Sequence, residues 1–267
     1  MLNFIDFLRI DPVIFSIGPL DIRWYSVSYI LGLILGIQYM KYLNNKLELK
    51  LNNFLINDFF LWAALGIIIG GRLGYVILYN PSYYLNESIE ILQVWKGGMS
   101  FHGGLIGVIF SLIIFASKNK INLFILSDLV ACAAPIGIFF GRIANFINGE
   151  LFGRITESNL GIIFPHIDKQ LRHPSQIYEA LFEGLLLFII LFFLTNIKKI
   201  RDKNGFLSAF FLILYSIFRF ICEFFREPDS HIGLLFLNLS LGQIYCIPFL
   251  FIGFFIFLKR FKNYEFT

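Results

Sequence analysis

Seven apolar runs of about twenty residues each set the strongest limit on how this chain folds, because a helix of that length crosses the roughly 30 Å hydrocarbon core of a bilayer. Hydrophobic residues make up 57% of the sequence and the mean hydropathy is +0.73. The sequence therefore predicts an all-α integral membrane protein, with residues 1–267 forming a single polytopic membrane domain. The predicted spans are Trp24–Leu43, Phe54–Tyr79, Met99–Ser117, Leu126–Asn148, Ile177–Ile197, Phe206–Phe225 and Leu239–Leu258.

The distribution of basic residues predicts the orientation of the spans. Twelve of the 22 basic residues lie in connections on one side: Lys41, Lys46, Lys50, Lys118, Lys120, Lys198, Lys199, Arg201, Lys203, Lys259, Arg260 and Lys262. The opposite side carries seven, and in longer segments. Positive residues concentrate on the cytoplasmic side, so the N-terminus is predicted outside and the C-terminus in the cytoplasm. The net charge of +4 then reflects topology and does not indicate a nucleic-acid partner.

Three outer segments are predicted from their polarity. Residues 80–98 are expected to form a surface arm, and residues 149–174 a small cap or head. The N-terminal segment from Met1 to Leu20 lacks a basic region typical of a signal peptide and is expected to lie on the outer interface. The cysteines all fall inside predicted spans, where they are expected to pack as small apolar side chains without a disulfide or a metal cluster: Cys132, Cys222 and Cys246.

Glycines spaced by four recur in the spans and predict close helix packing, since the missing side chains let two backbones approach. They are Gly32 and Gly36; Gly66, Gly70 and Gly74; Gly103 and Gly107; and Gly137 and Gly141. Arg72 lies inside the second group, and the sequence offers Asp58 or Asp128 as its partner.

Polar residues end the fourth span in the stretch from Gly141 to Glu150. Arg142, Asn145 and Asn148 are three residues apart and lie on nearly one helix face. One interpretation is a pocket for an anionic headgroup, because a guanidinium matches phosphate oxygens in pairs. The other is an arginine that extends from the helix end to the interface, with Asn148 and Gly149 as the C-cap.

A second charged stripe lies at the end of the sixth span. Arg219, Glu223 and Arg226 fall on one face of the predicted helix. They form either an ion pair that orients helices or a site with surplus positive charge, which an anion balances.

Two further segments carry candidate polar residues. His102 stands at the mouth of the third span among five glycines, where a ligand can approach closely. It is either a hydrogen-bonded interface residue or a catalyst. Ser175 is expected to cap the fifth span, which leaves His173 and Glu179 unexplained.

Several stretches together resemble one family, the bacterial prolipoprotein diacylglyceryl transferases. They lie in the family's order over nearly the whole chain, although Ser26 replaces a common glycine and the segment from Leu151 to Arg172 is shorter than in many members. The stretches are Ile17–Pro19 with Arg23–Tyr25, Gly70–Tyr75, Gly97–Gly107, Gly141–Arg154, Arg172–Glu179, Arg219–Pro228 and Ser240–Gln243.

The resemblance implies transfer of a diacylglyceryl group from phosphatidylglycerol to the lipobox cysteine thiol of a preprolipoprotein, with release of glycerol 1-phosphate. It also implies seven spans in the bacterial cytoplasmic (inner) membrane and a small periplasmic head. The residues expected to be catalytic are His102, Arg142 and Arg219; those expected to bind substrate are Arg142, Tyr25, Asn145, Asn148, Glu150, Gly153, Glu223 and Arg226.

The chemistry needs a thiolate and a stabilised leaving phosphate, but no cofactor or metal, because the phospholipid is already an activated donor. His102 is the candidate base, with Glu223 or the arginines themselves as alternatives. A phospholipid transporter or scramblase with the same arginines remains the alternative function. An intramembrane protease built on Ser100 is disfavoured, since Ser100 and His102 would point to different sides of a helix.

Overall fold

The computed structural model describes residue 11 and residues 13–17, 20–228 and 233–265, and in this part the chain is mainly helical. It divides into two compact units, which are described separately: residues 1–40 with 130–267, and residues 41–129. Most of the predicted N-terminal interface segment, with Asp6, Pro12 and Pro19, lies outside the described residues.

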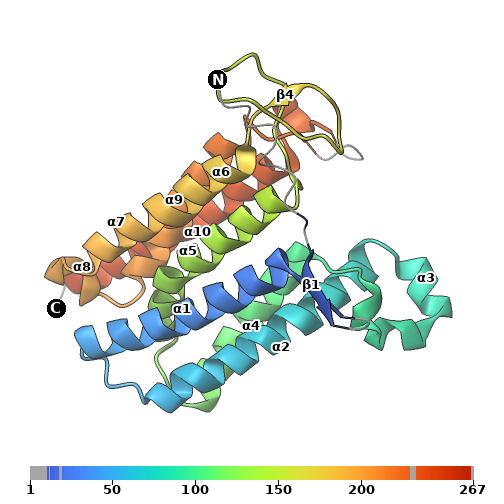
Figure 1. The fold of residues 1–267 in the computed structure, drawn as a ribbon. Coiled ribbons are helices and arrows are strands. Elements are labelled where there is room, and N and C mark those ends of the chain that lie inside the picture. The colour runs from blue at the N-terminus through green and yellow to red at the C-terminus, as the bar shows by residue number, and fades with distance from the viewer. Residues whose placement is uncertain (1–10, 12, 18–19, 229–232, 266–267) are drawn as a thin grey trace. The chain divides into compact units, whose positions relative to one another are not determined.

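Each of the seven predicted spans coincides with a helix (Figure 1). The fifth span changes from α-helix to π-helix and back, as α6, η4 and α7. The helices are α1 (Trp24–Lys46), α2 (Asn53–Leu78), α4 (Phe101–Lys118), α5 (Leu123–Ile147), α6 (Ser175–Glu179), η4 (Ala180–Leu186), α7 (Leu187–Leu194), α9 (Phe206–Cys222) and α10 (Leu241–Glu265).

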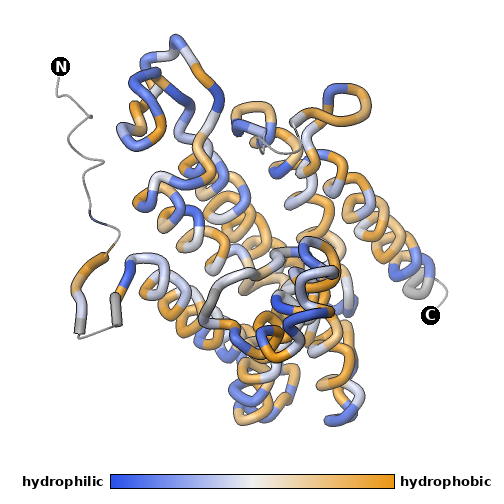
Figure 2. The backbone as a smooth tube through the Cα atoms, turned by 90° about the vertical axis from the view of Figure 1, so that its right-hand side faces the viewer, coloured by the Kyte–Doolittle hydropathy of each residue, from blue (hydrophilic) through white to orange (hydrophobic). Residues whose placement is uncertain are grey.

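Length and composition support membrane crossing for part of this set. Four helices are long and apolar enough by themselves: Asn53–Leu78, Leu123–Asn148, Ser175–Leu194 and Leu241–Lys262. Two apolar helices are shorter, His102–Lys118 and Phe206–Cys222. Figure 2 shows hydrophobic residues along the helices and hydrophilic residues gathered at many helix ends and connections. A multi-pass membrane protein follows, while the full count of seven crossings stays a prediction.

The fold is not purely helical. Strands β1 (Val13–Ile17) and β2 (Leu20–Arg23) pair antiparallel before α1, so part of the segment expected on the interface is a β-ribbon. Strands β3 (Ile162–Ile163) and β4 (Leu171–Arg172) pair in the predicted head. Short strands escape a search for long apolar runs, because two to five residues give too little periodicity.

In residues 41–129, α2 and α4 pack through the predicted glycines. A Cβ on Gly70 would lie 2.8 Å from the Cα of Gly107, and a Cβ on Gly74 would lie 2.7 Å from the Cα of Gly103. Nothing larger than hydrogen fits at these positions. The packing role predicted for this glycine group is confirmed.

Arg72 of α2 is buried, but its partners are not the predicted Asp58 or Asp128. Its guanidinium donates hydrogen bonds to four backbone carbonyl oxygens and lies 5.1 Å from the ring centre of Tyr84. The carbonyl oxygens belong to Glu90 (2.5 Å), Ile91 (3.0 Å), Gly97 (2.5 Å) and Gly98 (3.2 Å). Arg72 thus holds the predicted arm, which contains α3 (Pro81–Asn86), η2 (Ser88–Leu92) and η3 (Val94–Lys96). Carbonyl oxygens accept hydrogen bonds from a guanidinium as carboxylates do, and no sequence pattern distinguishes them.

We expect Arg72→Met to detach this arm. The substitution removes the donor of four part-buried hydrogen bonds to this segment, and one hydrogen bond to a charged group contributes about 1.5–3 kcal/mol. Limited proteolysis of the detergent-solubilised protein should then cut between residues 80 and 98 faster than in the wild type. Arg72→Lys, which keeps a charged donor, should be cut at an intermediate rate; equal rates for all three proteins would contradict the anchoring role.

In the other unit, α9 packs against α10 and against the α6–α7 helix, and Figure 1 shows these helices side by side. Gly184 in η4 lies against α5, where a Cβ would come 2.8 Å from the Cα of Phe139. Gly32 of α1 lies against Gly137 of α5, with a Cβ position 3.1 Å from the Cα of Gly137. Small residues therefore bring α1 and η4 close to the helix that carries Arg142.

Candidate functional site

Two arginines and two glutamates from three helices meet inside the unit formed by residues 1–40 and 130–267. Arg142 extends from α5, and its Nη1 lies 2.9 Å from Glu179 Oε2 while its Nη2 lies 3.2 Å from Glu183 Oε2. Arg219 extends from α9, and its Nη1 lies 2.6 Å from Glu179 Oε1 and 3.3 Å from Glu183 Oε1. Both glutamate side chains are fully buried, so each pair is formed away from water.

Glu223 and Arg226 extend this group. Arg219 Nη2 donates to Glu223 Oε1, and Arg226 Nη1 lies 3.5 Å from Glu179 Oε1. The other oxygen of Glu223 accepts a hydrogen bond of 2.6 Å from the Ser240 hydroxyl. We call the six charged residues the Arg–Glu cluster: Arg142, Arg219, Arg226, Glu179, Glu183 and Glu223.

The cluster carries three positive and three negative groups. This corrects the surplus of positive charge expected from Arg219, Glu223 and Arg226 alone, because Glu179 and Glu183 approach from another helix. It also corrects the expected single helical stripe. Helix α9 ends at Cys222, and Arg226 follows in an extended segment that bridges to Gly153.

Sequence reasoning missed Glu183 and left Glu179 without a role. The available signal was two carboxylates four residues apart at the start of an otherwise apolar span, where charged groups are unfavourable unless they are paired or functional. Glu183 belongs to the π-helix η4. Short π-helical segments are frequent at functional sites, but no pattern in this sequence predicts one.

The start of α10 holds Glu223 in place. Ser240 caps the helix by accepting a hydrogen bond from the Gln243 backbone N–H at 3.2 Å, and the Gln243 side chain accepts one from the Ser240 backbone N–H at 2.9 Å. This reciprocal pair is a capping box. A Cβ on Gly242 would lie 2.6 Å from the carboxyl carbon of Glu223, so glycine makes room for the carboxylate.

The end of α5 brings three predicted residues together. The side-chain amides of Asn145 and Asn148 each donate to the carboxylate of Glu150, both over 3.4 Å. Gly149 has φ of +68° and terminates the helix, while the Glu150 backbone N–H bonds to the Asn145 carbonyl oxygen. The predicted C-cap is confirmed, and the turn returns Glu150 toward the two amides.

Tyr25 lies in the first turn of α1 in the same unit. It accepts a hydrogen bond of 3.2 Å from the hydroxyl of Tyr29, one helical turn further on, and the two rings are 4.9 Å apart between centroids.

Gly153 lies at the junction between the head and the segment that carries Arg226. Its N–H donates to the His173 carbonyl oxygen over 3.0 Å, and the next N–H, of Arg154, donates to the Phe225 carbonyl oxygen over 2.8 Å. A Cβ on Gly153 would lie 2.6 Å from that Phe225 oxygen. Only glycine fits between these backbones, which explains the residue without requiring contact with a substrate.

Arg172 fastens the head to this junction. Its guanidinium pairs with Asp168 at 2.7 Å and Glu227 at 3.3 Å, and lies 4.9 Å from the Phe152 ring centre. The hydrogen bond from Arg172 holds the pKa of Asp168 below its usual range. Ser175 does not cap α6 as predicted; its hydroxyl donates to the Leu151 carbonyl oxygen over 2.9 Å and ties the helix to the head.

His173 should make the stability of the head depend on pH. Burial lowers its pKa from the usual 6.5, so the folded head favours the neutral imidazole. The stabilisation is present above about pH 6.5 and is lost as pH falls through the lower folded-state pKa. Between pH 7 and 5, thermal unfolding of the wild type should therefore move to lower temperature more than that of His173→Gln. Parallel shifts in the two proteins would exclude His173 as the cause.

His102 lies in the first turn of α4, in the unit formed by residues 41–129, and is half-buried. Ser100 caps that helix by accepting a hydrogen bond from the Gly103 N–H at 3.2 Å, which gives Ser100 a structural role.

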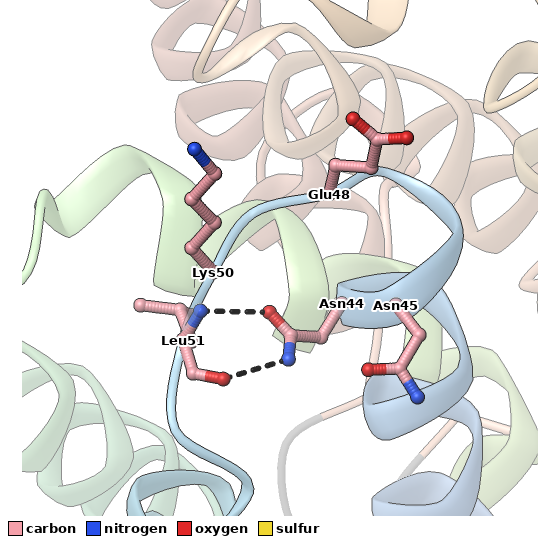
Figure 3. Close-up of a pocket in the computed structure, with 5 residues that line it drawn as sticks. All are labelled: Asn44, Asn45, Glu48, Lys50 and Leu51. Atoms are coloured by element: carbon pink, nitrogen blue, oxygen red, sulfur yellow. Dashed lines mark hydrogen bonds between the residues drawn. The ribbon is translucent and has the colours of Figure 1, made fainter.

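A surface pocket of the same unit is formed by other residues, in the connection between α1 and α2. There the Asn44 amide bonds both the N–H and the carbonyl oxygen of Leu51 (Figure 3). No predicted site residue lines this pocket.

Comparison with known proteins gives consistent matches. A family model described as prolipoprotein diacylglyceryl transferase matches residues 12–259. A protein of Rickettsia bellii (strain OSU 85-389) named "Phosphatidylglycerol--prolipoprotein diacylglyceryl transferase" is 50% identical over 253 residues, which cover 95% of this chain and 96% of the relative. Proteins of the same name from Rickettsia felis and Rickettsia canadensis are each 51% identical over 247 residues, covering 92% of this chain and 95% of the relative.

Proposed function

The chain belongs to the prolipoprotein diacylglyceryl transferase family, and from this membership we propose that it transfers the diacylglyceryl group of phosphatidylglycerol to a preprolipoprotein. The acceptor is the thiol of the lipobox cysteine. A carbon–sulfur bond forms, the bond between the glycerol carbon and the phosphate oxygen breaks, and glycerol 1-phosphate leaves. The thiol proton passes to a base.

The observation that carries this proposal is the pair of largely enclosed guanidinium groups, Arg142 and Arg219, which share two fully buried carboxylates. The leaving phosphate gains negative charge as the bond breaks. Fixed positive groups in a poorly hydrated site stabilise such charge strongly, because no water must reorganise. We assign the phosphate to these two arginines, with Arg226 as a third positive neighbour.

The groups near the end of α5 are assigned to the glycerol headgroup. Asn145 and Asn148 each donate to Glu150, and together the three side chains offer amide donors and a carboxylate acceptor to glycerol hydroxyls. Tyr25 adds a hydroxyl from α1. Gly153 and Glu223 act by holding Arg226 and Arg219 in place.

We assign the base to His102. The alternative, Glu223, has both carboxylate oxygens engaged, one by Arg219 and the other by Ser240. His102 lies beside Gly103 and Gly104 in the first helical turn, and an imidazole accepts protons near neutral pH.

The proposed topology has seven crossings in the bacterial cytoplasmic (inner) membrane, with the N-terminus in the periplasm and the C-terminus in the cytoplasm. The excess of lysine and arginine in the α1–α2, α4–α5 and α7–α9 connections supports this orientation. Residues 80–98 and 149–174 then face the periplasm, where they meet the preprolipoprotein. In this proposal the whole chain forms one polytopic membrane domain.

The test is an assay of the purified protein in detergent with phosphatidylglycerol and a lipobox peptide, read by mass spectrometry. A diacylglyceryl mass added to a Cys peptide, but not to its Ser counterpart, is the expected result. Arg142→Ala should abolish it. Folded protein that binds phosphatidylglycerol without forming the adduct would contradict transfer, and lipid movement in reconstituted vesicles would then favour the transporter.

A further inference from the structure

The Arg–Glu cluster is balanced by its own side chains. Among the described residues, its ion pairs join three guanidinium groups to three carboxylates. The arginine side chains are 12–16% exposed and the glutamate side chains at most 5%. If a phosphodiester binds to Arg142 and Arg219, as the proposed function requires, it brings a fourth negative charge to this buried group. An excess charge in such surroundings is strongly unfavourable.

The three carboxylates are not held equally. Glu179 contacts all three arginines, at 2.9, 2.6 and 3.5 Å. Glu223 contacts Arg219 and also accepts the Ser240 hydroxyl at 2.6 Å. In the described part of the chain Glu183 has two ion pairs, at 3.2 Å with Arg142 and 3.3 Å with Arg219. These are the same two guanidinium groups to which we assign the phosphate, so Glu183 and the phosphate compete for the same donors.

The groups around Glu183 would favour its neutral form once those donors are engaged. Glu179 lies one turn before it on the same helix, and two carboxylates at this spacing repel each other. Arg142 faces it from α5 and Arg219 from α9. Three groups that are neutral near pH 7 also lie in electrostatic range of Glu183: Tyr215 and Cys222 of α9 and Cys246 of α10. The ion pairs of Glu183 within the described part of the chain are those with Arg142 and Arg219.

We infer that Glu183 keeps the charge of the site balanced: it takes up one proton from solvent when the phosphate of the donor lipid binds Arg142 and Arg219, and releases it when glycerol 1-phosphate leaves. Glu183 is thereby a positioning residue for the reaction. The inference rests on the proposed function, but it assigns a role that transfer by itself does not require.

Proton uptake can be measured directly by titration calorimetry with a short-chain phosphatidylglycerol. The same titration in two buffers of different ionisation enthalpy gives the number of protons bound with each lipid. The wild type should bind one proton, and its dissociation constant should rise by up to about tenfold per pH unit where Glu183 is ionised in the free protein. Glu183→Gln should bind the lipid without proton uptake and with no such pH dependence.

The matched control is Glu157→Gln, the same chemical change at an exposed carboxylate of the head, outside the Arg–Glu cluster. It should retain the proton uptake of the wild type. Unchanged uptake in Glu183→Gln, or no uptake in the wild type, would overturn the inference. If Glu183→Gln does not fold, Glu183→Asp should move the midpoint of the pH dependence while Glu157→Asp leaves it in place; no movement in either would also overturn it.

The proposed transferase function and the proposed role of Glu183 can be disproved separately. Thioether formation without proton uptake would leave the transferase intact and remove only the role of Glu183. Absence of both lipid binding and thioether product in folded protein would remove the proposed function, and the inference with it. Thermal unfolding of each variant, measured beside the calorimetry, establishes that the protein is folded.

Discussion

Arg142→Lys should lower the rate of transfer by a factor on the order of 10²–10³, which is the loss typical when one preorganised donor to a developing negative charge is removed. Arg142 uses two separate nitrogens, Nη1 toward Glu179 and Nη2 toward Glu183. A lysine keeps the positive charge but presents a single ammonium group, which cannot reproduce this fork. The loss should appear in kcat as well as in kcat/KM, because charge on the leaving phosphate develops in the transition state.

The assay should compare Arg142→Lys with Arg201→Lys at saturating and limiting phosphatidylglycerol. Arg201 lies in the short helix α8 (Lys198–Arg201), is partly exposed and pairs with Asp202 at 3.4 Å. The same chemical change there should leave transfer unchanged, since surface pairs contribute little. Near-normal transfer by Arg142→Lys would show that charge alone suffices and that the guanidinium fork has no role.

The helices and the polar groups within them were predictable because each leaves a strong local signal. A run of about twenty apolar residues predicts a membrane-spanning helix. An arginine such as Arg142 within such a run is conspicuous because a charged group is energetically unfavourable inside the membrane. The glycine spacing predicted close helix packing without naming the partners, and the structure shows such packing between α2 and α4. Asn145, Asn148 and Glu150 were expected to act together, and the structure places their side chains in contact.

The partners of these groups were not predictable, because pairing depends on which helices are neighbours. Arg219 was assigned one glutamate on its own helix, whereas its other two partners come from α6 and η4, about 40 residues earlier in the chain. The partners of Arg72 were unpredictable for a similar reason. They are backbone carbonyl oxygens, which every residue has and which no sequence pattern marks. The π-helix and the backbone bridge at Gly153 are likewise set by tertiary packing.

Gly103→Ala should destabilise the unit formed by residues 41–129, whereas Gly104→Ala should not. A Cβ at position 103 would lie 2.9 Å from the Cα of Gly74 and closer still to the carbonyl oxygen of Gly70. Both obstacles are backbone of α2, so relief requires the two helices to move apart. Overpacking of this kind costs about 1–3 kcal/mol.

At Gly104 the nearest atom to a new Cβ is the Ile67 carbonyl oxygen at 3.6 Å, an ordinary contact. Alanine is also the better helix former by about 0.5–1 kcal/mol, so Gly104→Ala should be neutral or stabilising. Thermal unfolding in detergent, followed by circular dichroism, should separate the two variants, although they differ by one position in the same helical turn. Equal unfolding temperatures would mean that the α2–α4 seam tolerates a methyl group, and that the repeated glycines serve something other than close approach of the two backbones.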